Sequence, residues 1–66
     1  MAISLRHIEV FRAVMTSGSV TRAAELLHTS QPTTSRELAR FESLVQIKLF
    51  DRVRGRLIPT AQALAL

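Results

Sequence analysis

Residues 29–36, Thr-Ser-Gln-Pro-Thr-Thr-Ser-Arg, carry the signals of a helix start. The hydroxyl of Ser30 can accept a hydrogen bond from a free first-turn N–H, and Pro32 fits only in that turn, where its missing N–H has no partner to lose. Side chains that suit a core recur downstream at intervals of four, three and four residues: Thr34, Leu38, Phe41 and Val45. This spacing predicts a helix over residues 31–45 with one face buried.

The opposite face of the predicted helix carries polar groups on its first turns. Glutamine and arginine match the hydrogen-bonding edges of adenine and guanine, and proline and threonine can pack on the methyl group of thymine. The first turn of a recognition helix meets base edges in the DNA major groove. The sequence therefore predicts four base-reading residues: Gln31, Pro32, Thr33 and Arg36. The simpler alternatives are a solvated Gln31, helix initiation by Pro32, and a surface ion pair of Arg36 with a carboxylate.

Two further helices are predicted upstream, over residues 5–17 and from residue 20 to about residue 28, with Ser4 and Ser19 as caps and Gly18 as a left-handed terminus. The first has an apolar stripe at three- and four-residue spacing: Leu5, Ile8, Phe11, Val14 and Met15. The second has small and apolar residues on its buried face: Val20, Ala23, Ala24 and Leu27. A short turn joins the second helix to helix 31–45, and this pair forms a helix-turn-helix.

Five polar residues in or next to the two helices of the helix-turn-helix are candidates for contacts with phosphate groups, and two of them, Thr21 and Arg22, lie at a helix start. The start of a helix attracts anions because its first N–H groups are unpaired and its dipole is positive there. The candidates are Ser19, Thr21, Arg22, Ser35 and Arg40. Contacts of this kind set the register of a protein on DNA, whereas contacts with base edges supply the specificity.

The pattern changes after residue 45. Residues 47–50 and 56–58 form short runs that favour β-strands, and Gly55 supplies the tight turn between them. We therefore expect a small hairpin, the wing, over residues 51–58. It carries three arginines, which are further candidates for DNA contacts: Arg52, Arg54 and Arg56. At least one of the last two is expected in a narrow minor groove, and the alternative is a merely solvated tip.

The charge of the chain favours a nucleic-acid partner. The chain has 66 residues, a length that allows one domain. Its nine Lys and Arg residues against five Asp and Glu residues give a formal charge of +4. Eight of the nine basic residues are arginine, the side chain that binds guanine and phosphate bidentately. The alternative explanation for the arginine content is a GC-rich genome.

Other classes of function are poorly supported. The chain has no cysteine, which excludes a disulfide framework and a thiolate metal site, so we expect no metal and no cofactor, and structural roles for both histidines. No spacing of Ser, His and acid indicates a catalytic triad, and an enzyme is not expected. No run approaches the roughly 20 apolar residues that span a bilayer, and no signal peptide is recognisable. We expect a cytoplasmic protein, associated with the nucleoid, and no contact with membranes.

The whole pattern from residue 5 to residue 66 resembles the N-terminal DNA-binding domain of LysR-type transcriptional regulators. The motifs that carry the resemblance, in chain order, are Leu5-Arg6-His7, Phe11, Gly18-Ser19, Ala23-Ala24, Leu27, Ser30-Gln31-Pro32, Ser35-Arg36, Phe41-Glu42, Leu49-Phe50, Arg52 and Thr60. Alanine pairs are common, but the full set in this order and spacing is highly specific.

The resemblance implies a mainly α fold, a winged helix-turn-helix with a three-helix core, a short hairpin and the start of a linker helix. It implies sequence-specific binding of double-stranded DNA at interrupted inverted repeats near promoters, with helix 31–45 in the major groove and wing 51–58 at the minor groove. It also implies a homodimer or tetramer, built through the linker helix and a C-terminal effector domain. A Glu42–Arg52 ion pair between the third helix and the wing is a further implication.

We expect the chain to divide into two parts: residues 1–59 form the winged helix-turn-helix DNA-binding domain, and residues 60–66 form a separate last segment. Thr60 caps this last apolar segment, which is shorter than two turns and is unstable alone as a helix. We therefore expect it to be truncated, and the resemblance implies that it is the start of a dimerising linker helix. An alternative function follows from the same segment, a protein-interaction or dimerisation module with residues 57–66 as its interface.

Three residues depart from the family pattern. Gln46 stands where glycine is usual after the third helix, and a left-handed backbone there costs about 1 kcal/mol more for glutamine. Thr34 replaces an aliphatic residue on the core face, so its hydroxyl needs a partner such as the carbonyl one turn back. Ala63 replaces a glycine near the start of the linker helix. These departures affect local stability and leave the predicted base-reading residues unchanged.

Overall fold

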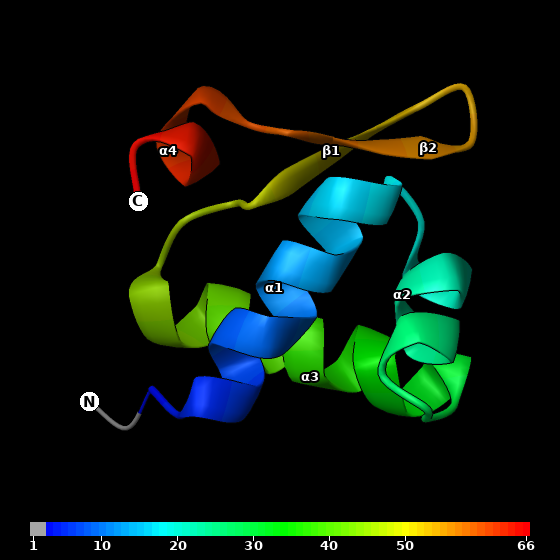
Figure 1. Cartoon of the computed structure of the whole chain (residues 1–66). Coiled ribbons are helices and arrows are strands. Elements are labelled where there is room, and N and C mark those ends of the chain that lie inside the picture. Colours follow the sequence, from blue (N-terminus) through cyan, green and yellow to red (C-terminus); the bar gives the residue numbers. More distant parts are fainter. Residues whose placement is uncertain (1–2) are drawn as a thin grey trace.

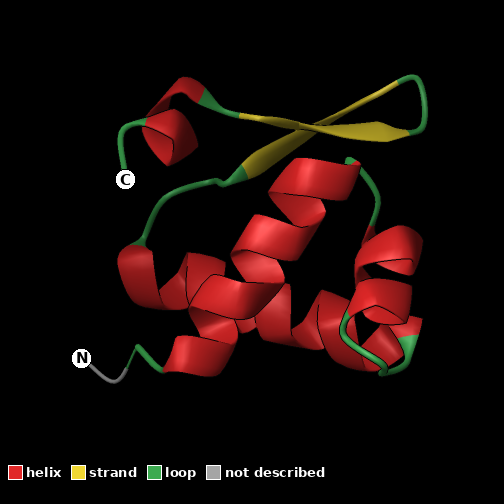
Figure 2. Cartoon of the chain, viewed as in Figure 1, coloured by secondary structure: helices red, strands yellow, loops and turns green. Residues whose placement is uncertain are grey.

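The computed structural model describes residues 3–66, which form four helices and one hairpin. The elements in chain order are α1 (Leu5–Ser17), α2 (Val20–Leu26), α3 (Gln31–Val45), β1 (Phe50–Val53), β2 (Arg56–Pro59) and α4 (Ala61–Leu64). The first three helices pack into one body, and the hairpin crosses the end of α1 above them (Figure 1). Figure 2 shows this hairpin as the single sheet of the described residues. The predicted fold class, a mainly α winged helix-turn-helix, is confirmed.

Each helix begins at a side chain that accepts a hydrogen bond from an N–H three residues later. The four capping residues are those expected from the sequence: Ser4, Ser19, Ser30 and Thr60. A cap of this kind stabilises a helix by about 1 kcal/mol. The predicted bounds of α1 and α3 are confirmed, because local capping signals mark both of their starts.

The predicted apolar stripe of α1 is partly wrong. Phe11 and Val14 are buried as expected, but Leu5 is 73% exposed and Ile8 is 42% exposed, whereas Val10 is fully buried. A helix turns 100° per residue, so each step of three residues drifts by about 60° around the axis. A run of such steps therefore places Leu5 and Val14 on opposite sides of the helix.

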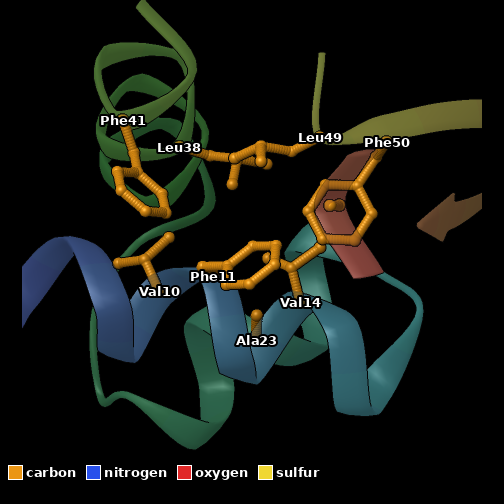
Figure 3. Packing of buried hydrophobic residues seen from close by; sticks show 9 residues of the cluster. Val10, Phe11, Val14, Ala23, Leu38, Phe41, Leu49 and Phe50 are labelled. Carbon is orange, nitrogen blue, oxygen red and sulfur yellow. The ribbon is translucent and has the colours of Figure 1, made fainter. Parts of the chain in front are cut away.

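The core joins all three large helices to the base of the hairpin. Its buried side chains are Val10, Phe11, Val14, Ala23, Leu38, Phe41, Leu49, Phe50 and Ala63 (Figure 3). The Phe11 ring lies at the centre, with its centroid 5.7 Å from those of both Phe41 and Phe50. His7 stacks on Phe41 at 5.9 Å and its Nδ1 accepts the N–H of Ser4, which agrees with a structural role.

Helix α2 ends at Leu26, two residues before the predicted end. The backbone of His28 is left-handed, with φ of 57°, so the helix cannot continue through it. The N–H of Thr29 instead closes onto the carbonyl of Ala24 at 2.9 Å. The resulting turn is tight and leads directly into α3.

The first strand of the wing lies later in the chain than predicted. It runs from Phe50 to Val53, not over residues 47–50, and pairs with β2 so that Val53 lies opposite Arg56. Arg54 and Gly55 both have positive φ, 54° and 77°, as a two-residue type I′ turn requires. This short turn brings the first strand up to Val53, and the apolar run before it serves burial because Leu49 is fully enclosed.

The two expectations about unusual backbone and buried hydroxyl are confirmed. Gln46 is left-handed with φ of 57°, and its N–H donates to the carbonyl of Glu42 at 2.9 Å. The hydroxyl of Thr34, which is fully buried, donates to the carbonyl of Ser30 at 2.9 Å. Ala63 is also buried and accommodates its methyl group in the core. Among residues 3–66, no helix has the length and apolar character needed to cross a membrane.

Candidate nucleic-acid interface

Helix α3 presents a polar face to solvent while its other face is held in the core. Thr34, Leu38 and Phe41 are buried, and the last two belong to the core shared with α1, α2 and the wing. The residues predicted to contact bases or phosphates on this helix are exposed, except for the half-buried Thr33: Gln31, Pro32, Ser35, Arg36 and Arg40. The amphipathic spacing in the sequence therefore gives the arrangement that a groove-reading helix needs.

The four predicted base-reading residues differ in how far they are already engaged. The Ser30 hydroxyl donates to Oγ1 of Thr33 at 2.8 Å, so the Thr33 side chain is held close to the helix cap. Gln31 and Pro32 occupy the exposed first turn. Arg36 forms no ion pair with a carboxylate among residues 3–66, so the alternative interpretation of this residue as a surface ion pair is not supported. Its side chain is exposed.

Glu37, the acidic neighbour of Arg36 in the sequence, forms an ion pair that joins α3 to α1. Nε of Arg6 lies 3.2 Å from Oε2 of Glu37, and both side chains are partly buried. The pair ties α3 to α1 and keeps the carboxylate of Glu37 engaged beside the polar face. The sequence carries no signal for it, because the two residues are 31 positions apart.

The predicted phosphate candidates at the start of α2 are close together but not all free. The Ser19 hydroxyl accepts the N–H of Arg22, and Thr21 is exposed between them. Nη1 of Arg22 lies 3.1 Å from Oε1 of Glu25, with both side chains more than half exposed. An exposed pair of this kind contributes only about 0–1 kcal/mol, so Arg22 can exchange its partner for a phosphate at little cost.

A polar recess of about 140 Å³ opens where the starts of α2 and α3 meet the wing. Figure 1 shows the turn of the hairpin on the side of the molecule where α2 lies. The lining residues are Ser19, Val20, Thr21, Gln31, Arg52, Gly55 and Leu57. The structure thus brings together predicted phosphate residues, one predicted base-reading residue and one wing arginine, although they lie far apart in the sequence.

The expectation of a Glu42–Arg52 ion pair, which came from the resemblance, is wrong. Both residues line a second recess of about 310 Å³ that also contains Ser35, but they form no ion pair among residues 3–66. Oε2 of Glu42 instead accepts the N–H of Leu49 at 2.8 Å. Leu49 is fully buried, and a buried N–H requires an acceptor, which this carboxylate supplies.

The three wing arginines have different surroundings. Arg52 borders both recesses, and Arg54 occupies the exposed type I′ turn at the tip. Arg56 lies back over the α1–α2 turn, where a side-chain carbon at position 18 would be 3.6 Å from its Nη2. The N–H of Leu57 donates to the carbonyl of Gly18 at 3.1 Å and holds this part of β2 against α1. Arg54 is therefore the wing arginine that lies in the turn itself, between the two strands.

Known proteins with the same sequence pattern are much longer than this chain, which matches only part of each of them. The sequence profile of the bacterial regulatory helix-turn-helix protein, lysR family, matches residues 5–64. The transcriptional activator protein LysR of Escherichia coli (strain K12) is 71% identical over 65 residues, 98% of this chain and 21% of that protein. The regulator DgcR of a Pseudoalteromonas species is 58% identical over 59 residues, 89% of this chain and 20% of that protein. The chain thus spans about a fifth of the length of these relatives.

Solved structures with DNA share the fold. The DNA-binding domain of BenM in complex with benA site 1 DNA has a TM-score of 0.89 and 32% identity, over 96% of this chain and 71% of that one. The complex of the CbnR DNA-binding domain with DNA has a TM-score of 0.89 and 30% identity, over 96% and 72% of the two chains. Vibrio fischeri DarR in complex with DNA has a TM-score of 0.92 and 26% identity, over 98% and 22%. The chain belongs to the LysR family of bacterial regulatory helix-turn-helix proteins.

Proposed function

We propose that this chain binds double-stranded DNA sequence-specifically as the N-terminal module of a LysR-type transcriptional regulator. The observation that carries the proposal is the division of α3 into two faces. Thr34, Leu38 and Phe41 hold one face in the core, while the side chains from Gln31 to Arg40 on the other face are presented to solvent. The DNA-bound structures of BenM and CbnR domains, which share the fold, support it.

In this proposal α3 enters the major groove and the wing reaches the minor groove. The base-reading residues are Gln31, Pro32, Thr33 and Arg36, and the phosphate-binding residues are Ser19, Thr21, Arg22, Ser35 and Arg40. The recess between α2, α3 and the wing supports this division, because it places hydroxyls and a guanidinium beside the first turn of α3. The wing contributes Arg52, Arg54 and Arg56, with Arg54 closest to a groove. Binding of this kind needs neither a cofactor nor a catalytic step.

The proposal extends to the protein that contains this module. Residues 1–59 form the DNA-binding domain, and residues 60–66 start a linker helix through which the protein assembles as a homodimer or tetramer. A two-fold assembly reads an interrupted inverted repeat near a promoter, because half-site symmetry mirrors protein symmetry. Such a protein acts in the cytoplasm, on the nucleoid.

A selection of bound duplexes from random oligonucleotides tests the proposal. The chain is expected to enrich a common motif, because several side chains on α3 discriminate between bases. Arg36→Ala should enrich a more degenerate motif, whereas Glu9→Ala, on the exposed face of α1, should enrich the same motif as the unaltered chain. Recovery of unrelated sequences by the unaltered chain would contradict sequence-specific binding.

A second candidate function rests on an apolar surface at the end of the chain. Leu64 is 69% exposed and Leu66 is 59% exposed, and Leu66 borders an apolar cleft of about 360 Å³ with Ile3 and Ile8. A protein-interaction or dimerisation module would use this surface. A gel shift with random DNA at two salt concentrations separates the candidates, since the absence of a shift at low salt favours protein interaction alone.

A further inference from the structure

The joint between α3 and the wing is held by hydrogen bonds from α3 and from the residue that caps α4. Oε2 of Glu42, on α3, accepts the N–H of Leu49 at 2.8 Å. From the other side, the N–H of Thr60 donates to the carbonyl of Leu49 at 2.9 Å, and its hydroxyl donates to the carbonyl of Lys48 at 2.6 Å. Thr60 is also the cap of α4. The N–H of Leu49 is therefore bonded to the Glu42 side chain, and its carbonyl is bonded to the backbone of Thr60.

Burial makes this joint rigid. Leu49 is fully enclosed and its side chain enters the core between Leu38 and Phe50 (Figure 3). A hydrogen bond from a buried N–H to a carboxylate is about twice as strong as one between neutral groups, and its loss would leave the N–H unpaired. The chain reverses at the left-handed Gln46, which brings Leu49 back against the α3 turn that carries Glu42.

The charge of Glu42 also calls for an explanation at this position. Its carboxylate borders the recess that contains Ser35 and Arg52, which are predicted to contact DNA. A carboxylate there repels phosphate, so it works against binding in the proposed function. The contact with Leu49 gives this side chain a different task.

We propose that Glu42 is a positioning residue for the wing. Its bond to Leu49 sets the angle at which β1 leaves α3, and so sets the place of Arg54 relative to the polar face of α3. This inference rests on the proposed function. The bond between Leu57 and Gly18 holds the wing to α1, whereas Glu42 holds it to the helix that enters the major groove.

The length of the strand amplifies small changes at the joint. The tip at Arg54 is five residues beyond Leu49, or roughly 16 Å at the rise of a strand. A tilt of about 10° at the joint therefore moves the tip by roughly 3 Å, and a hydrogen bond spans only about 2.7–3.2 Å. A wing that is loose at Leu49 cannot keep a groove contact at its tip.

A double-mutant cycle tests the proposal, with a duplex recovered by selection from random sequence as the probe. Arg54→Asn removes the guanidinium and leaves an Asn-Gly turn, which suits the type I′ geometry. In the unaltered chain this change should weaken binding at least about fivefold, as the loss of a groove contact does. In a Glu42→Ala background the same change should weaken binding less than about twofold, because the tip is no longer held in place.

Glu42→Gln separates positioning from charge. The amide keeps an oxygen acceptor for the Leu49 N–H, so the full effect of Arg54→Asn should return. Glu9→Ala, which removes an exposed carboxylate of α1, is the matched control and should leave that effect unchanged. Thermal unfolding of each variant ensures that binding is compared where all are folded. If Glu42→Ala does not fold, Glu42→Asp replaces it, since a chain shorter by about 1.5 Å cannot keep the contact.

The outcomes distinguish this inference from the function on which it rests. If Arg54→Asn costs the same factor in both backgrounds, within about twofold, Glu42 does not position the wing and the inference is overturned. If Arg54→Asn has no effect on the unaltered chain, the groove contact of the wing is itself refuted, and the inference fails with it. Loss of selective binding by the unaltered chain would instead refute the proposed function as a whole.

Discussion

Arg36 stands on the exposed face of α3, two positions after the buried Thr34, and has no ion-pair partner among the described residues. An arginine that binds a base edge bidentately discriminates between bases, whereas one that binds phosphate does not. The neighbouring acid, Glu37, is engaged by Arg6 and does not compete for it. At the residue scale, specificity in this account depends on Arg36 above all.

Arg36→Ala should reduce the preference for a selected duplex over one with a changed motif by about 1–3 kcal/mol. Arg40→Ala is the matched comparison, because Arg40 is proposed to bind phosphate and its loss should weaken binding to both duplexes by a similar amount. Binding isotherms on the two duplexes measure both effects. An equal loss on both duplexes for Arg36→Ala would show that this residue contacts the DNA backbone instead.

Residue-level contacts differ in how well the sequence reveals them. The caps at Ser4, Ser19 and Ser30 join groups three positions apart, so short-range pattern is enough to find them. The Glu42–Leu49 bond depends on the chain reversal at Gln46, which places a buried N–H, and not a guanidinium, against the carboxylate. No local pattern records which of two nearby partners will be desolvated.

At the scale of elements, the end of α3 determines where the wing begins. The helix ends at Val45, because the next residue, Gln46, has a left-handed backbone with φ of 57°. Glycine adopts this conformation without the steric cost that a side chain imposes. The C-terminal end of α3 is thus a site of strain in an otherwise well-capped element.

Gln46→Gly should raise the free energy of unfolding by about 1 kcal/mol, because it removes this strain. Gly18→Ala provides the opposite test. Gly18 has φ of 73°, so an alanine there should lower the free energy of unfolding by a similar amount. Urea unfolding followed by circular dichroism measures both. A stability of Gln46→Gly at or below that of the unaltered chain would mean that the glutamine side chain makes a contribution that outweighs the strain.

The elements also show where sequence patterns mislead. The bounds of α3 were predictable because a cap, a proline and a regular core spacing all agree. The first strand begins later than the run of residues 47–50 predicts, since that run reflects the burial of Leu49 and Phe50, while the strand itself carries the exposed Asp51 and Arg52. Hydrophobicity locates buried residues, and the two-residue turn locates the strands.

At the scale of the whole molecule, the charge of +4 on 66 residues predicts an electrostatic contribution to binding. Each phosphate neutralised by an arginine releases a counterion, so affinity falls as salt rises. With about three such contacts, a fourfold rise in salt should lower affinity roughly 40-fold. Titrations at a series of salt concentrations measure the slope, and affinity that is independent of salt would contradict phosphate binding.

The whole molecule holds two candidate surfaces that lie on different residues, the polar face of α3 with the wing, and the apolar cleft near Ile3, Ile8 and Leu66. In the proposed function, the first of these surfaces contacts DNA. Titration of the chain with a selected duplex, followed by the NMR shifts of backbone amides, tests it directly. We expect the largest changes from Gln31 to Arg40 and at the wing turn. Changes concentrated at Ile3, Ile8 and Leu66, with α3 unaffected, would contradict it.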